Sequence, residues 1–218
     1  MIRNIISYYS RRASEYEKIY QRPERQEDLA KLKEFISKIF GGRNILEIAC
    51  GTGYWTQFIA ESARSICAID HSSEVLKLAK QKDYKKCKIS FIESDAYSLK
   101  NVKGSFDGGF CGFWWSHLPK SRRNNFIKSF HSKLAKDALV VMIDNRYVKG
   151  NSTPFSRTDS NGNTYQIRKL EDETEYEVLK NFPDERELKV LLSPYAKKIH
   201  YTDFAYYWLI KYYVSNNL

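Results

Sequence analysis

Short apolar runs alternate with helical periodicity along the central part of the chain. The apolar runs lie at residues 44–49, 65–69, 88–93, 105–112 and 138–143. Between them, apolar positions recur every three or four residues from about Tyr54 to Ala63, after the possible capping residues Ser72 and Ser73, and over 120–135. Strands that alternate with helices predict an α/β fold with a mainly parallel, doubly wound sheet.

Helical periodicity also precedes the first strand. Tyr9, Ala13, Tyr16 and Tyr20 form one stripe of a helix over 7–20. The helical period recurs over 26–40, and Gly41 and Gly42 are expected to end this helix. We therefore expect residues 1–40 to form an N-terminal helical cap.

The alternation ends at Asp144. Residues 145–183 are rich in turn residues and contain two strand-like runs, 164–170 and 174–179, which predict a β-hairpin inserted after the fifth strand. Long insertions of this kind serve as lids or binding elements. A short helix over 184–192 and closing strands over 197–201 and 204–214 complete one predicted domain, 1–218.

Composition narrows the class of protein. The 218 residues include no apolar run long enough for a membrane span and no apolar centre of a signal peptide near the start. The four cysteines are widely spaced, which predicts reduced thiols in a cytoplasmic protein. The net charge of +10 raises the question of nucleic acid, but the lysines are spread along the chain, which favours a solvated basic surface.

The segment 45–56, ILEIACGTGYWT, carries the chemistry. It predicts a strand, a loop of small residues and a helix start, the arrangement that holds a nucleotide-like ligand. A dinucleotide fingerprint needs a third small residue, yet Tyr54 and Thr56 occupy the two candidate places. A phosphate P-loop needs a lysine that the loop lacks. The acid Glu47 beside the loop suits a cationic ligand instead.

S-adenosylmethionine is a ligand of that kind, because it carries an ammonium and a sulfonium and no phosphate. Glu47 can pair with the amino group, and the rings of Tyr54 and Trp55 can lie near positive charge. The segment resembles motif I of the class I S-adenosylmethionine-dependent methyltransferases. Asp70 ends the second strand about 20 residues after Glu47, where an acid can hold the ribose hydroxyls.

Further motifs extend the resemblance over residues 40–145. Asp95 is similar to the family residue that receives the adenine amino group, Ala96 would offer its backbone N–H, and Phe106-Asp107 is similar to the family's fourth-strand motif. The pattern is most similar to the small-molecule branch that includes the ubiquinone/menaquinone-biosynthesis type (methyltransferase type 11). In that branch a helix with tyrosines often closes over the cofactor, and Arg11 or Arg12 would meet its carboxylate.

The resemblance implies a seven-stranded Rossmann-like sheet, mostly parallel with an antiparallel last strand. It also implies a methyltransferase of EC class 2.1.1 that uses S-adenosyl-L-methionine and releases S-adenosyl-L-homocysteine. The cofactor-binding residues it implies are Tyr16, Tyr20, Glu47, Ala49, Cys50, Gly51, Gly53, Tyr54, Trp55, Thr56, Asp70, His71, Asp95, Ala96 and Phe113.

Motifs that do not occur in the sequence exclude some classes of methyl acceptor. No Asn/Asp-Pro-Pro-Tyr/Phe follows the fourth strand and no Pro-Cys or Thr-Cys nucleophile occurs, which argues against amino and C5-pyrimidine methylation. Asp144-Asn145 fits half of a catechol-type metal site, but Trp114 and Trp115 stand where the first acid belongs, so no metal is expected. Methyl transfer to O or C by proximity remains, with His117 either a general base or a histidine hydrogen-bonded in a turn.

The expected acceptor is a small molecule. An arginine-lined insertion favours an anionic or phenolic one, and the expected substrate-binding residues are Trp114, Trp115, Arg146, Tyr147, Tyr165 and Arg168. Two alternatives stay open: an RNA acceptor, motivated by the net charge, and a cofactor-binding protein without catalysis.

Overall fold

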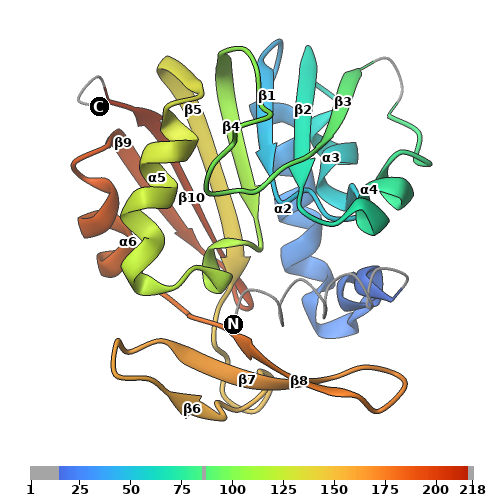
Figure 1. Ribbon diagram of the computed structural model, residues 1–218, viewed down its shortest axis with the longest axis vertical. Coiled ribbons are helices and arrows are strands. Elements are labelled where there is room, and N and C mark those ends of the chain that lie inside the picture. The colour runs from blue at the N-terminus through green and yellow to red at the C-terminus, as the bar shows by residue number, and fades with distance from the viewer. Residues whose placement is uncertain (1–14, 85–86, 216–218) are drawn as a thin grey trace.

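A seven-stranded sheet forms the centre of the computed structural model, which describes residues 15–84 and 87–215 (Figure 1). The strand order is β3-β2-β1-β4-β5-β10-β9. Only β10 runs antiparallel to its neighbours, so the predicted, mostly parallel sheet with an antiparallel last strand is confirmed. The strands are β1 (Asn44–Ile48), β2 (Ser65–Asp70), β3 (Lys88–Glu93), β4 (Phe106–Gly112), β5 (Leu134–Asn145), β9 (Ala196–Asp203) and β10 (Tyr207–Val214).

Helices cover both faces of this sheet (Figure 1). On one face, α2 (Gln26–Ile39), α3 (Tyr54–Ile59) and α4 (Ser73–Ala79) pack their apolar sides against the inner strands. On the other face, α5 (Arg123–His131) and α6 (Glu185–Leu192) enclose the second core. The two cores hold the strands rigidly, so the loops at the strand ends are presented from a fixed frame.

Several helices are shorter than the sequence predicted. The helix expected over 120–135 is α5 preceded by the 3-10 turn η4 (Lys120–Arg122), and Leu134 already belongs to β5. Leu134 still packs in the core, but it pairs with Phe106 as a strand residue. An apolar residue between a helix and a strand fits the helical period as well as the strand period. The hydrophobic pattern alone therefore did not show where the helix ends and β5 begins.

A small second sheet lies across the carboxyl ends of the main strands (Figure 1). It consists of β6 (Arg157–Thr158), β7 (Thr164–Lys169) and β8 (Glu175–Leu179). The predicted hairpin is therefore present as β7 and β8, and β6 adds a third strand. Two residues are too few to show alternation, and turn residues surround them, so β6 had no signal in the sequence.

The helix expected over 7–20 takes a different form where it is described. Residues 1–14 lie outside the described part of the chain, and η1 (Tyr16–Gln21) and η2 (Pro23–Arg25) are 3-10 turns. Arg22 is extended, with φ −62° and ψ 122°, because the following Pro23 disfavours a helical conformation there. The sequence signal for this break was the proline itself.

Candidate active site

Two cavities meet at the carboxyl ends of β1, β2, β4 and β5. The first cavity, of about 100 Å³, is lined by the loop after β1, the end of β2 and the turn after β4. The second, of about 90 Å³, lies between the N-terminal turns, the end of β5 and the small sheet. Phe113 and His117 line both cavities, so a ligand in one contacts the same side chains as a ligand in the other.

The loop after β1 curls around the first cavity. Ala49, Gly51 and Gly53 all have positive φ angles, of 53°, 56° and 77°. A Cβ atom at Gly53 would lie 2.2 Å from the Tyr84 hydroxyl and 3.3 Å from Ala79 Cα, and the positive φ adds strain for any other residue, so glycine is favoured there. Ala49 adopts a conformation that is uncommon for a residue with a side chain, and strain of this kind concentrates at functional sites.

Glu47 is buried beside this loop, with 1% of its surface exposed. Among the described residues, none hydrogen-bonds its Oε2 atom. Burial raises the pKa of Glu47 to about 8, and the charge of Asp70 acts in the same direction. A buried carboxyl oxygen without a partner is costly unless a ligand completes it. The arrangement therefore fits a ligand that brings a cation or a donor to Glu47.

Aromatic rings surround the space next to Glu47. A small separate pocket, which shares Ala49, Gly51, Thr52 and Gly112 with the first cavity, is also lined by Glu47, Cys50, Tyr20, Tyr54 and Trp55. The Tyr20 and Tyr54 rings stack with centroids 3.8 Å apart, and Trp55 Nε1 donates to the Tyr20 hydroxyl over 3.1 Å. These faces suit positive charge near Glu47. The Tyr16 side chain, expected in the same role, lies outside the described part of the structure.

Asp70 closes the opposite side of the first cavity. Its Oδ2 accepts the Gly51 N–H over 2.9 Å and its Oδ1 accepts the Ser72 N–H over 3.0 Å. Burial raises the pKa of Asp70, and these backbone donors oppose the rise. The carboxylate is thus held in place by the loops it joins, with lone pairs left for a ligand.

The remaining predicted cofactor residues divide into two groups. His71, Ala96 and Phe113 line the first cavity, whereas Thr56 is fully buried beneath it. Asp95 is not among the lining residues, because its Oδ1 accepts the Tyr97 and Ser98 N–H groups and caps the next turn. Thr52, Ile69, Ser72, Val75 and Ser94 also line this cavity and were missed, since small and apolar residues in loops carry no distinctive signal.

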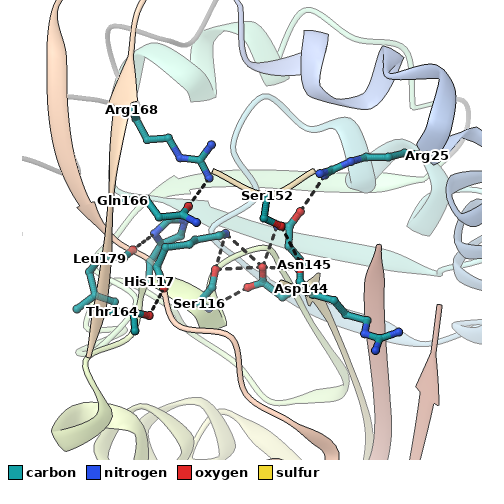
Figure 2. A network of polar contacts seen from close by, with 12 residues as sticks. Arg25, Ser116, His117, Asp144, Asn145, Ser152, Thr164, Gln166, Arg168 and Leu179 are labelled. Carbon is teal, nitrogen blue, oxygen red and sulfur yellow. Dashed lines mark hydrogen bonds and ion pairs between the residues drawn. The ribbon is translucent and has the colours of Figure 1, made fainter. Parts of the chain in front are cut away.

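Cationic side chains line the second cavity: Arg22, Arg25, Arg146, Arg168 and Lys180. No aspartate or glutamate is among the described residues that line it. Figure 2 shows Arg25 and Arg168 reaching toward the same region from opposite sides. A concave site with one sign of charge attracts ligands of the opposite sign.

Lys180, one of these lining residues, is held by a buried network that includes Ser116 and Asp144, and Figure 2 shows these two side chains. Its Nζ donates to Ser116 Oγ over 2.6 Å and lies 3.4 Å from Asp144 Oδ1. Ser116 donates its N–H to Asp144 Oδ2 over 2.8 Å. Burial tends to raise the pKa of Asp144, but the Lys180 charge takes it below its ordinary value, so this carboxylate is ionised. Asp144 thus holds the ammonium in position.

His117 stands where the two cavities meet. Its Nδ1 lies 2.8 Å from the Leu179 backbone oxygen, and since a carbonyl only accepts, Nδ1 carries the proton. Burial and the Lys180 charge lower the pKa of His117 to about 3. The imidazole is therefore neutral. It is hydrogen-bonded in the turn η3 (Trp115–His117), as one of the two expectations has it, and it lines both cavities, whereas its role as a general base stays a prediction.

The expected substrate residues are distributed over different environments. Arg168 and Arg146 line the second cavity, although the Arg146 guanidinium also pairs with Asp203. Trp114 lines the first cavity instead. Trp115 is fully buried against Phe126. It lines neither cavity, because successive residues of a tight turn point to different sides.

Tyr147 and Tyr165 also lie outside the cavity walls. Tyr165 is buried within the small sheet, where its hydroxyl donates to Asp159 over 2.9 Å. Tyr147 is 38% exposed. Both were expected to touch the substrate because they belong to the insertion. Strand alternation turns Tyr165 into the small sheet, whereas Tyr147 contacts Phe182, a residue of the cavity wall.

Arg25 and Lys180 were missed by sequence reasoning. Arg25 donates to Asn145 Oδ1 over 3.2 Å and to Asn151 Oδ1 over 2.8 Å. It sits at the end of a short turn, and Lys180 follows β8, so each looks like an ordinary basic residue in the sequence. Their role depends on contacts between distant segments.

Neither a membrane helix nor a metal cluster is found within 15–84 and 87–215. No helix there is long and apolar enough to cross a bilayer. No group of three or more His, Cys, Asp or Glu side chains gathers in the same residues.

Comparisons with known proteins agree with this geometry. Residues 45–137 match a family model described as a methyltransferase domain. A demethylmenaquinone methyltransferase of Lactococcus lactis is 35% identical over 83 residues, 36% of this chain and 33% of the relative. An uncharacterized methyltransferase of Bacillus cereus is 30% identical over 113 residues, 52% of this chain and 51% of the relative. The matches thus span a third to a half of these relatives.

Solved structures match over nearly the whole chain. A DhpI-SAH complex has a TM-score of 0.79 at 24% identity and covers 99% of this chain and 98% of that one. The N-methyltransferase NodS of Bradyrhizobium japonicum, in complex with S-adenosyl-L-homocysteine, has a TM-score of 0.66 at 16% identity and covers 97% and 98%. The resemblance drawn from the motifs is confirmed at the level of the fold.

Proposed function

We propose that this chain, which has the class I methyltransferase fold and a methyltransferase domain at residues 45–137, transfers a methyl group from S-adenosylmethionine to a small anionic acceptor. The observation that carries the proposal is the meeting of the two cavities at Phe113 and His117. The loop residues and Asp70 that line one cavity would suit a cationic nucleoside, and cations line the other. A donor and an acceptor bound in these cavities would touch the same two side chains.

The donor would be held by charges of opposite sign and by hydroxyl acceptors. Glu47 would pair with the amino group, Asp70 would accept the ribose hydroxyls, and the Ala96 backbone would meet the adenine. Tyr20 and Tyr54 would present their ring faces near the positive charge. When bound, S-adenosylmethionine supplies a methyl group that its sulfonium already activates, so positioning is the main task left to the protein.

The acceptor would bind between Arg25, Arg168 and Lys180. These cations favour the ionised form of an acidic oxygen, so the nucleophile arrives with a free electron pair. In the transfer, the bond between methyl carbon and sulfur breaks as the bond between carbon and oxygen forms, and the released thioether is neutral. No proton has to move, which suits a neutral His117 whose pKa of about 3 makes it a weak base. We propose that His117 orients the acceptor.

The first test is binding followed by turnover. A thermal-shift assay should show stabilisation by S-adenosylhomocysteine and none by NAD. Methyl transfer from isotope-labelled S-adenosylmethionine should then occur to small phosphonates or carboxylates and not to neutral alcohols or tRNA. Stabilisation by NAD alone, or methyl incorporation into tRNA only, would overturn the proposal. Cofactor binding without turnover on any acceptor would favour a non-catalytic protein.

A charge variant tests the acceptor site. Arg168→Met should raise the acceptor KM about tenfold, as expected when a charge-assisted contact is lost, and leave the Kd for S-adenosylhomocysteine unchanged. Arg157→Met is the matched control, because Arg157 lies on the neighbouring strand and pairs with Glu177 away from the cavity. Equal effects of the two variants would place the acceptor elsewhere.

A further inference from the structure

Three aromatic side chains form an exposed cluster on the loops that flank the small sheet. The Tyr147 and Phe155 rings stack with centroids 4.6 Å apart, and Phe182 meets them at 5.4 and 5.8 Å. We call these three residues the aromatic cluster. Tyr147 is 38% and Phe155 42% exposed.

The aromatic cluster borders the cationic cavity. Phe182 belongs to both, since it lines the cavity and touches the other two rings. Arg146 and Thr153, which come next to Tyr147 and just before Phe155 in the chain, line the cavity as well. A ligand that extends out of the cavity past Phe182 therefore meets Phe155 and Tyr147 next.

Stacked rings left in contact with water are an unusual use of large apolar side chains, and rings that rim a cavity are typical of ligand sites. Building on the proposed function, we infer that the aromatic cluster binds an apolar or aromatic tail of the acceptor. The acceptor is then an amphiphilic anion, with its charged head among Arg25, Arg168 and Lys180 and its tail on the three rings.

The chemistry of the walls supports this division. The cationic cavity is lined mainly by polar and charged side chains, which suit a charged head. The adjoining rings offer flat apolar surface with no charged group among them. A head alone would leave this surface uncovered, whereas a tailed acceptor covers it without entering the cavity of the methyl donor.

Acceptors with the same head and different tails test the inference. Benzylphosphonate and phenylacetate should bind the protein saturated with S-adenosylhomocysteine at least tenfold more tightly than methylphosphonate and acetate, by isothermal titration calorimetry. Phe155→Ala should raise the KM of a tailed acceptor about tenfold, because one ring contact is lost, and leave kcat unchanged. The short acceptors should not respond to this substitution.

Ile167→Ala is the matched control. Ile167 is also an exposed apolar residue of the insertion, at 40%, but alternation along β7 directs it opposite to its neighbours Gln166 and Arg168, which line the cavity. Equal affinity for short and tailed anions, or an equal effect of Ile167→Ala and Phe155→Ala, would overturn the inference and leave the proposed function standing. If S-adenosylhomocysteine binds and neither short nor tailed anions bind, the proposed anionic acceptor itself is wrong, and the inference about its tail falls with it.

Discussion

Glu47 shows how one side chain links a sequence motif to a ligand. It occupies the middle of a buried strand that pairs with a strand on each side, and within the described part of the chain its Oε2 lacks a partner. A carboxyl group in that position is destabilising in the free protein, because its charge is removed from water. A cationic ligand converts the same feature into binding energy.

The raised pKa of Glu47 predicts pH-dependent ligand binding. With a pKa of about 8 in the free protein, against an ordinary 4.5, Glu47 is protonated at pH 6 and must lose its proton to pair with an amino group. The affinity for S-adenosylhomocysteine should therefore rise from pH 6 to 8, by up to about tenfold per unit, and level off above it. Calorimetry at three pH values measures this.

Glu47→Gln is the control for that experiment. Its affinity should be lower at pH 8 and nearly independent of pH. The stability of the free wild-type protein should change in the opposite sense, falling as the pH rises from 4.5 to 8, because the folded state binds the proton more tightly than the unfolded chain. The same pH dependence in wild type and variant would contradict the assignment.

His117 leads to a prediction about turnover. Because its pKa of about 3 keeps it neutral throughout the physiological range, kcat for an ionised acceptor should stay flat between pH 5.5 and 8 with both substrates saturating. An inflection of kcat in this range that disappears in His117→Asn would instead support His117 as a general base.

At the scale of elements, the small sheet is attached to the main domain through Asn181. Its Nδ2 donates to the Leu118 oxygen over 3.0 Å, its Oδ1 accepts the Thr164 N–H over 3.0 Å, and its backbone N–H donates to the Ser116 oxygen over 2.7 Å. These bonds link β7 and β8 to the turn that carries His117. The element that closes the cationic cavity is thus fixed by hydrogen bonds at its root.

Asn181→Ala should lower the free energy of unfolding by about 2 kcal/mol, because it leaves buried backbone groups of Leu118 and Thr164 without partners. Chemical denaturation measures the change, and hydrogen exchange at the Thr164 amide reports whether the small sheet loosens first. Asn161→Ala, at an exposed position of the neighbouring turn, should change stability by less than about 0.5 kcal/mol. Equal effects would mean that Asn181 does not anchor the sheet.

The N-terminal turns are a second bridging element. Thr52 Oγ1 donates to Glu17 over 2.5 Å, and Glu17 also pairs with Lys82. Lys18 pairs with Glu171 of the turn between β7 and β8. This segment therefore joins the motif loop to the small sheet over the described part of the site, which supports the proposal that it acts as a cap.

At the scale of the whole molecule, the fold places a group of acidic side chains and a group of basic side chains side by side at one edge of the sheet. Glu47 and Asp70 belong to strands β1 and β2, and the cations come from β7, the end of β8 and the N-terminal turns. The overall charge of +10 adds a positive background to this separation. On the proposed function, an anionic acceptor and a cationic donor would thereby bind in different cavities.

This separation predicts different salt responses. Raising NaCl from 50 to 500 mM should weaken anionic acceptor binding several-fold, because mobile ions screen the cations, and change S-adenosylhomocysteine affinity by less than about twofold. Any tRNA binding should fall far more steeply and bring no methyl incorporation. Titrations at two salt concentrations test both statements, and salt-resistant RNA binding with methylation would contradict them.

The sequence by itself determined the parts of this protein that rest on local order. Strand and helix periods predicted a mainly parallel sheet, and the family resemblance predicted its seven strands. The spacing of Glu47, the small loop residues and Asp70 predicted that these residues gather at one site, because consecutive residues of one βα unit stay close in space. Only the tertiary structure decided the cationic cavity, where we propose that the acceptor binds. It brings Arg25, Arg168 and Lys180 together from distant segments, and it withdraws Trp115 and Tyr165 into packed interiors. Periodicity carries no information about which distant side chains will share a wall, so that part depended on the packing of the small sheet and the N-terminal turns against the strand ends.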